Sequence, residues 1–351
     1  MRGRKIRKGV GLPLALLTAT ALIAACSSSS STSSSSGGTT SSGGTKVSIA
    51  LDFIPNADNE GVFVADKLGY FSQAGIDVNI VPYGQTPPDT LASTGKVQFA
   101  IGDTESDVLF DFASGLKITS VMAVLQTNPS FFGTLSSNKT IMSPKDFCNQ
   151  TYGGFGYPGD PSIIAAVIQG AGGPSHCNVP VVTLGSSAYQ AVEAHRVGFS
   201  AFFFSDIIQA EVQQHASLRV FNENNYGVPN QYAALILGND AWLAANPALA
   251  HKFVNALVRA YTFIKNNPAE GARIEYEMNP TAVNLNVAIK SSEAMAKSYL
   301  LSPTGQIGVQ NTATWQAFGT FLYKRGAFTD SSGQKLTHNL DWGGFMTNKY
   351  L

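Results

Sequence analysis

Short apolar runs alternate with segments of helical spacing from Lys46 onward, and no other feature of the chain constrains its fold as strongly. Helical spacing is clearest over Asn59–Gly69 and Ser106–Gly115, each with a glycine near its end that can stop a helix. Such alternation predicts an α/β fold with doubly wound, largely parallel sheets that helices cover on both faces. The expected strands are Lys46–Phe53, Asp77–Tyr83, Val97–Gly102, Lys117–Gln126, Thr151–Phe155, Val179–Leu184 and Phe199–Phe204.

The expected elements form two successive sets, which predicts two lobes. We expect the chain to cross from the first lobe to the second near Ser136–Thr140 and to return near Val228–Ala233. The long helical stretches after the return would add a helical layer to the first lobe. The predicted boundaries are residues 46–136 and 233–351 for lobe 1, with the C-terminal helices, and residues 137–232 for lobe 2.

The first 25 residues have the pattern of an export signal. Five basic residues within Met1–Lys8 precede an uncharged apolar stretch, Val10–Ala25, which is shorter than the about 20 residues that span a bilayer. The run Leu22-Ile23-Ala24-Ala25-Cys26 resembles the lipobox of bacterial lipoproteins, in which the Cys is acylated and exposed by cleavage. We therefore expect a lipoprotein signal peptide over residues 1–25 and lipidation at Cys26. A plain secretory signal and an uncleaved anchor are the alternatives.

Residues 27–45 contain only Ser, Thr and Gly. Such a segment buries no apolar area that could offset its ordering entropy, so we expect a flexible Ser/Gly tether over residues 26–45. Together with the signal, the tether predicts an extracytoplasmic protein that the lipid anchor alone holds at the cell membrane.

The charge of the chain is unevenly distributed. The whole sequence has 23 basic and 23 acidic residues, but residues 1–25 hold five of the basic residues and no acidic one, so the remainder has 18 against 23, a net charge of −5. Nucleic-acid binding needs clustered Lys and Arg side chains that face phosphates, and the remainder contains no such block. We therefore exclude nucleic acid as a partner.

Cys148 and Cys177 are the two cysteines beyond the signal, and the expected compartment permits disulfides. A bond between them would close a loop of about 30 residues and stabilise the fold by about 3–4 kcal/mol. Two separate buried thiols are the alternative. Apart from His176, no residue gives the cysteines a spacing typical of zinc ligands, so we expect no metal site.

Four loops between predicted strands and helices form the candidate site: Asp52–Glu60, Gly102–Glu105, Gly156–Ser162 and Phe203–Asp206. Ligands of doubly wound sheets bind beyond the carboxyl ends of strands, where loops lead into helix N-termini. Helix capping and turn formation are the plainer interpretation of each loop taken alone. Because the loops come from both lobes and carry aromatic side chains that a turn does not need, we expect them to bind a ligand. The expected ligand-binding residues are Asp52, Phe53, Asn56, Asn59, Asp103, Thr104, Tyr157, Gly159, Asp160, Ser162, Phe204 and Asp206, with Phe53, Tyr157 and Phe204 as stacking walls.

These four loops contain several carboxylates and no Lys or Arg. Carboxylates only accept hydrogen bonds, so they suit a ligand with N–H donors, such as an amino-substituted heterocycle. Helix N-termini alone can hold an anion, so an anionic ligand stays open. The sequence has no Gly-x-Ser-x-Gly elbow, phosphate-binding loop or His-Glu-x-x-His, and we expect neither catalytic residues nor a cofactor.

Several short motifs resemble those of a family of solute-binding proteins. They are Leu51-Asp52-Phe53-Ile54-Pro55-Asn56, Gly61-Val62-Phe63-Val64-Ala65, Gly69-Tyr70-Phe71, Ser143-Pro144-Lys145-Asp146 and Tyr226-Gly227-Val228-Pro229. The chain is similar over most of residues 46–275 to the binding proteins for thiamine-pyrimidine precursors, within the broader group of nitrate, sulfonate and taurine binders. The pyrimidine binders often open with Asp-Trp-x-Pro-Asn-x-x-His. Here Phe53 replaces the Trp and Asn59 replaces the His.

The resemblance implies a type II periplasmic-binding-protein fold, in which two lobes joined by a two-strand hinge close on a ligand. It implies a monomeric solute-binding component of an ABC importer that delivers a small planar organic solute to a membrane permease and its ATPase. A thiamine-related aminopyrimidine fits best. Riboflavin and an alkanesulfonate or taurine-type solute are the alternatives, followed by an extracytoplasmic enzyme or a sensor.

Overall fold

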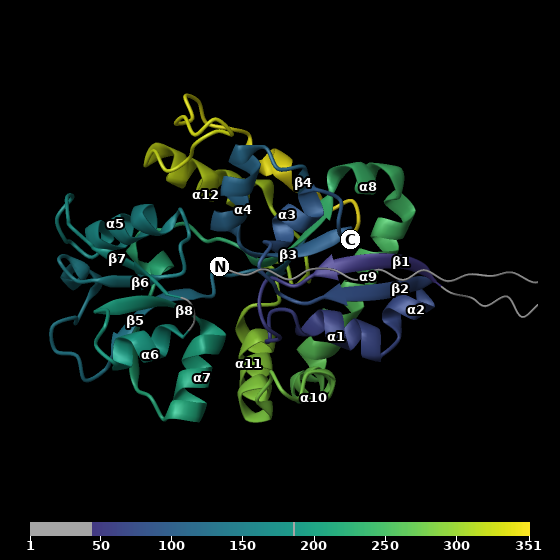
Figure 1. The fold of residues 1–351 in the computed structure, drawn as a ribbon, viewed down its shortest axis with the longest axis horizontal. Coiled ribbons are helices and arrows are strands. Elements are labelled where there is room, and N and C mark those ends of the chain that lie inside the picture. The colour runs from purple at the N-terminus through teal and green to yellow at the C-terminus, as the bar shows by residue number, and fades with distance from the viewer. Residues whose placement is uncertain (1–43, 185–186) are drawn as a thin grey trace, which may run out of the picture. The chain divides into compact units, whose positions relative to one another are not determined.

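The computed structural model describes residues 44–184 and 187–351, and the strands in this part of the chain form two five-stranded sheets (Figure 1). The first sheet has the order β2-β1-β3-β10-β4. Strand β1 pairs in parallel with β2 and β3, whereas β10 is antiparallel to both β3 and β4. The strands are β1 (Thr45–Ala50), β2 (Ile76–Val81), β3 (Phe99–Thr104), β4 (Ile118–Leu125) and β10 (Ala233–Asn239).

Helices from both ends of the described chain cover this sheet. Their ends follow local chemistry, because Thr104 accepts a hydrogen bond from the backbone of Asp107 at the start of α4, and Gly115 ends that helix at a φ of 85°. The helices are α1 (Glu60–Lys67), α2 (Tyr70–Gln73), α3 (Pro88–Ser93), α4 (Glu105–Ser114), α8 (Asp240–Ala245), α9 (Pro247–Asn266), α10 (Pro268–Met278), α11 (Leu285–Ser298) and α12 (Thr312–Lys324), followed by the 3₁₀ turn η3 (Trp342–Phe345).

The second sheet, on the left in Figure 1, has the order β7-β6-β8-β5-β9. Strand β6 pairs in parallel with β7 and β8, whereas β5 is antiparallel to β8 and β9. Its strands are β5 (Ser130–Leu135), β6 (Tyr152–Gly154), β7 (Val181–Thr183), β8 (Phe199–Phe203) and β9 (Leu218–Asn222). Its helices are α5 (Asp160–Gly170), α6 (Ala188–Glu193) and α7 (Phe204–Gln214), with the 3₁₀ turns η1 (Pro144–Phe147) and η2 (Glu223–Tyr226).

The first crossing between the lobes lies earlier than predicted. Strand β4 belongs to the first sheet and β5 to the second, so the chain changes sheets at Gln126–Pro129 and not near Ser136–Thr140. The prediction overlooked β5, a strand at Ser130–Leu135 that pairs on both sides with strands of the second lobe. The return lies between β9 and β10, and the predicted range Val228–Ala233 falls in this segment except for Ala233, the first residue of β10.

Side chains join the two crossing segments where the sequence predicted a two-strand hinge. Neither segment belongs to a strand of the described chain. The Asn128 backbone N–H donates to Asn230 Oδ1 at 2.9 Å, and Asn230 Nδ2 donates to the Gln126 carbonyl at 3.0 Å. Asn128 Nδ2 also donates to Glu223 Oε2 at 3.0 Å. The hinge is therefore a network of side-chain hydrogen bonds between two irregular segments.

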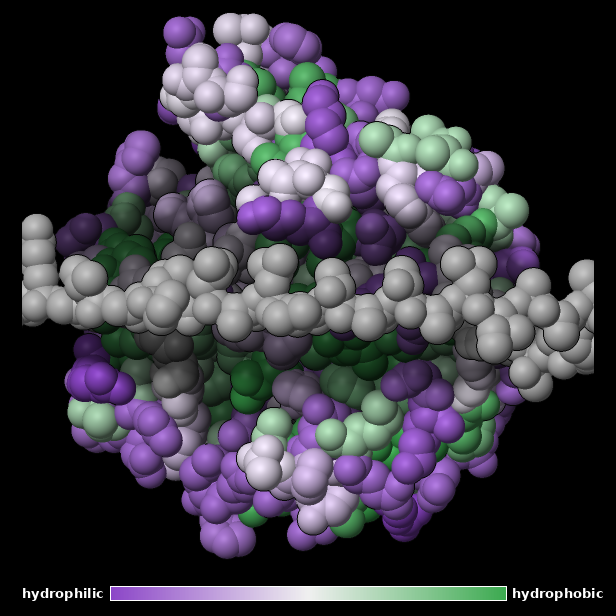
Figure 2. Space-filling view, turned by 45° about the vertical axis from the view of Figure 1, so that its right-hand side comes forward, coloured by the Kyte–Doolittle hydropathy of each residue, from purple (hydrophilic) through white to green (hydrophobic). Residues whose placement is uncertain are grey.

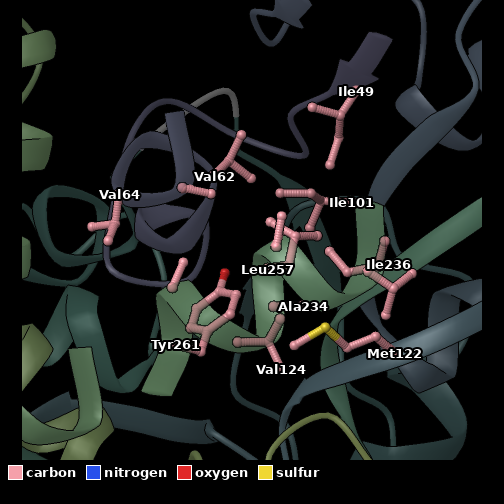
Figure 3. Close-up of a cluster of buried hydrophobic side chains, with 14 of the residues drawn as sticks. Ile49, Val62, Val64, Ile101, Met122, Val124, Ala234, Ile236, Leu257 and Tyr261 are labelled. Atoms are coloured by element: carbon pink, nitrogen blue, oxygen red, sulfur yellow. The ribbon is translucent and has the colours of Figure 1, made fainter. Parts of the chain in front are cut away.

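A large apolar core packs beneath the loop between β1 and α1, the first of the four candidate loops (Figure 3). Figure 3 shows Tyr261 of α9 among Val62, Val64 and Leu257. That hydroxyl donates to the Asp58 carbonyl at 2.6 Å. A Cβ on Gly61 would lie 2.4 Å from the Tyr261 ring, so only glycine allows α1 to approach α9 this closely.

Hydrophilic residues cover most of the outer surface on the face that Figure 2 shows. No helix of the described chain is both long and apolar enough to span a bilayer. The predicted signal peptide, Cys26 and nearly all of the tether lie outside the described residues. Thr45, the last residue of the predicted tether, already pairs with Ile76 in the first sheet.

A disulfide joins Cys148 to Cys177, with the two Cα atoms 5.4 Å apart. It ties the end of η1 to the segment between α5 and β7, two parts of the second lobe that are 29 residues apart in sequence.

Replacing both cysteines with Ser should lower the free energy of unfolding by about 3–4 kcal/mol, because the unfolded chain regains the entropy that the closed loop removes. Urea unfolding of the oxidised protein and of the double variant measures this difference. Equal midpoints and slopes would contradict the bond, and a peptide that contains both cysteines before but not after reduction would establish it independently.

Candidate ligand-binding cleft

A cavity of about 320 Å³ opens between the two sheets, and all four predicted loops line it. Asp52 and Phe53 follow β1, Asp103 lies at the end of β3, Tyr157 follows β6, and Asp206 lies in the first turn of α7 after β8. Each residue thus stands where a strand leads toward a helix, which is where ligands of such sheets bind.

Eight of the twelve expected ligand-binding residues line the cavity, and the structure places the other four nearby or in the core. The eight are Asp52, Phe53, Asn56, Asp103, Thr104, Tyr157, Asp160 and Asp206. The four outside the lining are Asn59, Gly159, Ser162 and Phe204.

Asn59 and Phe204 have structural positions that the sequence did not predict. Asn59 is fully buried and donates from Nδ2 to Asp52 Oδ1 at 3.3 Å, so it positions a lining carboxylate. Phe204, expected as a stacking wall, is buried and stacks on Tyr299, the residue after α11, with ring centroids 4.6 Å apart. Its neighbour Phe203, the last residue of β8, lines the cavity in its place.

Gly159 provides a close contact between the lobes. A Cβ at this position would lie 2.4 Å from Ser106 Oγ of α4, so a larger residue would require the Ser106 hydroxyl to move. Tyr157 reaches across the same boundary, and its hydroxyl donates to Asp103 Oδ2. The Phe204–Tyr299 stack is a further contact between the two lobes.

Exposed aromatic surface gathers at one wall of the cavity. Phe53 and Ile54 are 43% and 51% exposed, which is unusual for large apolar side chains, and both line the cavity. The Phe53 ring lies 5.5 Å from that of Tyr83, which is also exposed. From the second lobe, Phe155, Tyr157 and Phe203 add further aromatic surface. This arrangement suits a flat organic ligand.

Burial and mutual repulsion shift the ionisation of the lining carboxyl groups. Burial raises the pKa of Asp52 to about 7, with a further rise from the charge of Asp103. Burial also raises the pKa of Asp160 to about 7 and that of Asp206 to about 6, and the charge of Asp103 again adds to both. The Asp103 charge raises the pKa of the Tyr157 hydroxyl, so this hydroxyl stays a donor.

The residues that form the floor of the cavity were not expected from the sequence. Ser130, Glu223 and Gln231 line it, and all three adjoin the segments where the chain crosses between the lobes. Burial raises the pKa of Glu223 to about 7, while the hydrogen bond from Asn128 opposes the rise. A correct placement of the first crossing would have pointed to these residues, because two crossing segments necessarily lie at the base of a two-lobed cleft.

A second hollow of about 340 Å³ lies along α5, beside the disulfide. Its lining comes from the second lobe alone and is mostly apolar, from Pro161 to Val181, with His176 as its one ionisable side chain besides the bonded Cys177. The cleft between the sheets, with groups from both lobes, is therefore the better candidate site.

Two α/β lobes and a cavity between the ends of their strands define the class of two-lobed binding-protein folds. A family model described as NMT1/THI5 like matches residues 56–271, and the chain belongs to this family.

Two relatives extend this likeness. A formylaminopyrimidine-binding protein of Halalkalibacterium halodurans is 25% identical over 79% of this chain and 84% of its own. The riboflavin-binding protein RibY of Chloroflexus aurantiacus is 29% identical over 68% of this chain and 67% of its own. The predicted resemblance to solute-binding proteins of this group is confirmed.

The fold also matches solved structures. The alkanesulfonate-binding protein SsuA of Xanthomonas axonopodis pv. citri, bound to MOPS, superposes with a TM-score of 0.66 at 12% identity, over 86% of this chain and 98% of the other. This similarity confirms the predicted fold class.

Replacing Tyr157 with Phe should favour a more open arrangement of the lobes by about 1–2 kcal/mol, because it removes a hydrogen bond to a carboxylate and little else. Small-angle scattering should show a larger radius of gyration for this variant than for the parent protein. The control is Tyr323→Phe in α12, a tyrosine outside the cavity lining. Scattering curves that are identical for Tyr157→Phe and the control would contradict an interlobe role for the hydroxyl.

The protein should lose stability as the pH rises from about 4 to 7. Carboxyl groups ionise near pH 4 in an unfolded chain, but the raised pKa values of Asp52, Asp160, Asp206 and Glu223 delay this in the fold. The folded protein therefore binds more protons in this range, and its free energy of unfolding decreases with rising pH.

Thermal melts should accordingly give a lower midpoint at pH 8 than at pH 5 in buffers of equal ionic strength. Asp160→Asn, which keeps an acceptor for the Tyr152 hydroxyl, should reduce the difference, and Asp341→Asn on the surface should leave it unchanged. A midpoint that rises with pH would show that the lining carboxyl groups are not held protonated by the fold.

Proposed function

We propose that this protein is the solute-binding component of an ABC importer and that it captures a small planar organic solute, best a thiamine-related aminopyrimidine. The observation that carries the proposal is a cleft between two lobes that combines exposed aromatic walls with many carboxyl acceptors. The relative named as a formylaminopyrimidine-binding protein, which aligns over most of both chains, supports the same solute class.

The geometry suits such a solute in two ways. Phe53 on the first lobe and Phe203 or Tyr157 on the second can contact the two faces of a flat ring. Carboxyl oxygens of Asp103 and neighbouring residues can accept hydrogen bonds from amino groups at the ring edge. A neutral ring with such donors can both stack on the aromatic side chains and donate hydrogen bonds to the carboxyl oxygens. It makes all of these contacts only when both lobes touch it.

An alkanesulfonate fits these side chains poorly. Among the described residues that line the cavity there is no Lys, Arg or His, whereas carboxyl groups are abundant. A sulfonate would have to rely on backbone N–H groups at helix N-termini while facing several carboxylates. Riboflavin is the second candidate, since its ring system is flat and a relative is named for binding it.

Transport follows from lobe closure. Contacts that a ligand makes only in the closed arrangement shift the equilibrium toward it, and a permease can distinguish the two arrangements. In this account the protein acts outside the cytoplasm, Cys26 carries the lipid anchor, and the bound solute is released unchanged. Because the fold alone does not decide between binding and catalysis, chemical recovery of the solute belongs to the test.

Isothermal titration of the protein with formylaminopyrimidine, riboflavin and ethanesulfonate tests the proposal. We expect saturable binding of the aminopyrimidine, weaker or no binding of the sulfonate, and recovery of intact aminopyrimidine after incubation. Preference for the sulfonate would overturn the solute class, and conversion of the aminopyrimidine would overturn the assignment as a binding protein.

Replacing Phe53 with Ala should weaken binding of the aminopyrimidine by about 0.5–1.5 kcal/mol through loss of ring stacking. The melting temperature should change little, because the side chain is 43% exposed. Leu301→Ala removes a similarly exposed apolar side chain outside the cavity lining and should leave affinity unchanged. Titrations in which both variants match the parent protein would exclude Phe53 as a wall of the site.

A further inference from the structure

Seven carboxyl groups from both lobes line the cleft. They are Asp52, Asp58, Asp103, Asp107, Asp160, Asp206 and Glu223. The charge of Asp103 raises the pKa of five of the other six, which places it within electrostatic reach of groups on the β1–α1 loop, α4, α5 and α7. Glu223 in turn responds to Asp160.

The described protein groups that donate to these carboxyls are all neutral. Tyr157 donates to Asp103, Tyr152 to Asp160 at 2.9 Å, and Asn59 to Asp52. The remaining donors are the Thr104 hydroxyl to Asp107, Asn128 Nδ2 to Glu223 and the Phe203 backbone N–H to Asp206. Neutral donors satisfy lone pairs but do not cancel charge.

Basic side chains lie elsewhere. The two salt bridges within the described chain, Lys67–Glu277 and Arg273–Glu270, are outside the cavity lining and well exposed. The cluster therefore lacks a positive partner among the described protein groups that line it, although it is enclosed by apolar and aromatic side chains that raise the cost of each uncompensated charge.

Two buried lining atoms point to a ligand independently of the acidic cluster itself. Asp58 and Ser106 are each 4% exposed and line the cavity, yet within the described chain neither Asp58 Oδ1 nor Ser106 Oγ has a hydrogen-bond partner. Asp107 Oδ1 likewise has no hydrogen-bond partner within the described chain. Buried polar atoms are normally paired, so these atoms suit donors supplied from the cavity.

We propose that the solute is bound as an organic cation, with its positive charge beside Asp103 and the surrounding carboxyl groups. This inference rests on the proposed function and narrows its solute class from a ring with N–H donors to one that also carries a positive charge. No three of the described His, Cys, Asp or Glu side chains are arranged to hold a metal ion, whereas the aromatic walls suit a charged organic ring or ammonium group.

Cation binding is coupled to proton release. Carboxyl groups that hold protons in the fold lose them when a positive charge arrives, because the charge lowers their pKa. Raising the pH through the range in which Asp52, Asp160, Asp206 and Glu223 ionise, from about 6 to about 7, therefore strengthens binding of a permanent cation.

The test uses two probes that share one ring: 4-amino-5-aminomethyl-2-methylpyrimidine, whose primary ammonium stays charged, and its neutral 5-hydroxymethyl counterpart. A nearby positive charge shifts a carboxyl pKa by about one to three units, each unit being tenfold. We therefore expect the aminomethyl probe to bind at least about tenfold more tightly at pH 7.5, and its affinity to rise from pH 5.5 to 7.5. Asp103→Asn should reduce this preference, whereas Asp341→Asn, an exposed residue outside the lining, should preserve it.

Equal or tighter binding of the hydroxymethyl probe at pH 7.5 would contradict the proposal that the solute is a cation. It would still agree with the proposed aminopyrimidine ring. A preference for the aminomethyl probe that persists in Asp103→Asn, with melting temperature unchanged, would also overturn it. If neither probe binds at any pH while the protein remains folded by circular dichroism, the inference and the proposed aminopyrimidine fail together.

Discussion

Repulsion among buried carboxyl groups is the constraint on which the arrangement of the cleft depends. The ends of β1 and β3 in one lobe, and α5 and α7 in the other, bring Asp52, Asp103, Asp160 and Asp206 to one cavity. Each is tolerated because a neutral donor, such as Asn59 for Asp52, satisfies part of its hydrogen-bonding capacity. A ligand that supplies donors or positive charge to both lobes satisfies the remaining acceptor atoms and reduces the repulsion among the carboxyl groups. Because it does so only when both lobes contact it, binding favours closure.

The hinge and the site are parts of one hydrogen-bonded structure. Asn128 in the first crossing donates to Glu223, a carboxylate on the floor of the cavity. In the return crossing, Gln231 accepts from the backbone N–H of Ser106 at 3.1 Å, and the Tyr232 N–H donates to buried Glu105 at 3.0 Å. The start of α4, which carries lining residues, is thus hydrogen-bonded to the return crossing, and the floor of the cavity and the crossing segments form one network.

Local patterns in the sequence predicted the strand ends and the four loops well, because strand-to-helix loops and their acidic capping residues have local causes. Features set by long-range pairing were harder to predict. Asn128-Pro129 marks a turn before β5, but the place of this strand in the second sheet depends on its pairing with β8 and β9. The burial of Phe204, with Phe203 lining the cavity, has a similar origin, since Phe204 packs on Tyr299, a residue far away in the sequence. Glu223 was missed because its role depends on where the crossings meet.

A crystal structure of the protein grown with the aminopyrimidine probe would test the central claim most directly. The ring should lie in the cleft, against Phe53 on one side and an aromatic residue of the second lobe on the other. An amino nitrogen of the probe should then lie within hydrogen-bonding distance of a carboxyl group beside Asp103. A probe seated in the hollow along α5, or touching one lobe only, would contradict the account.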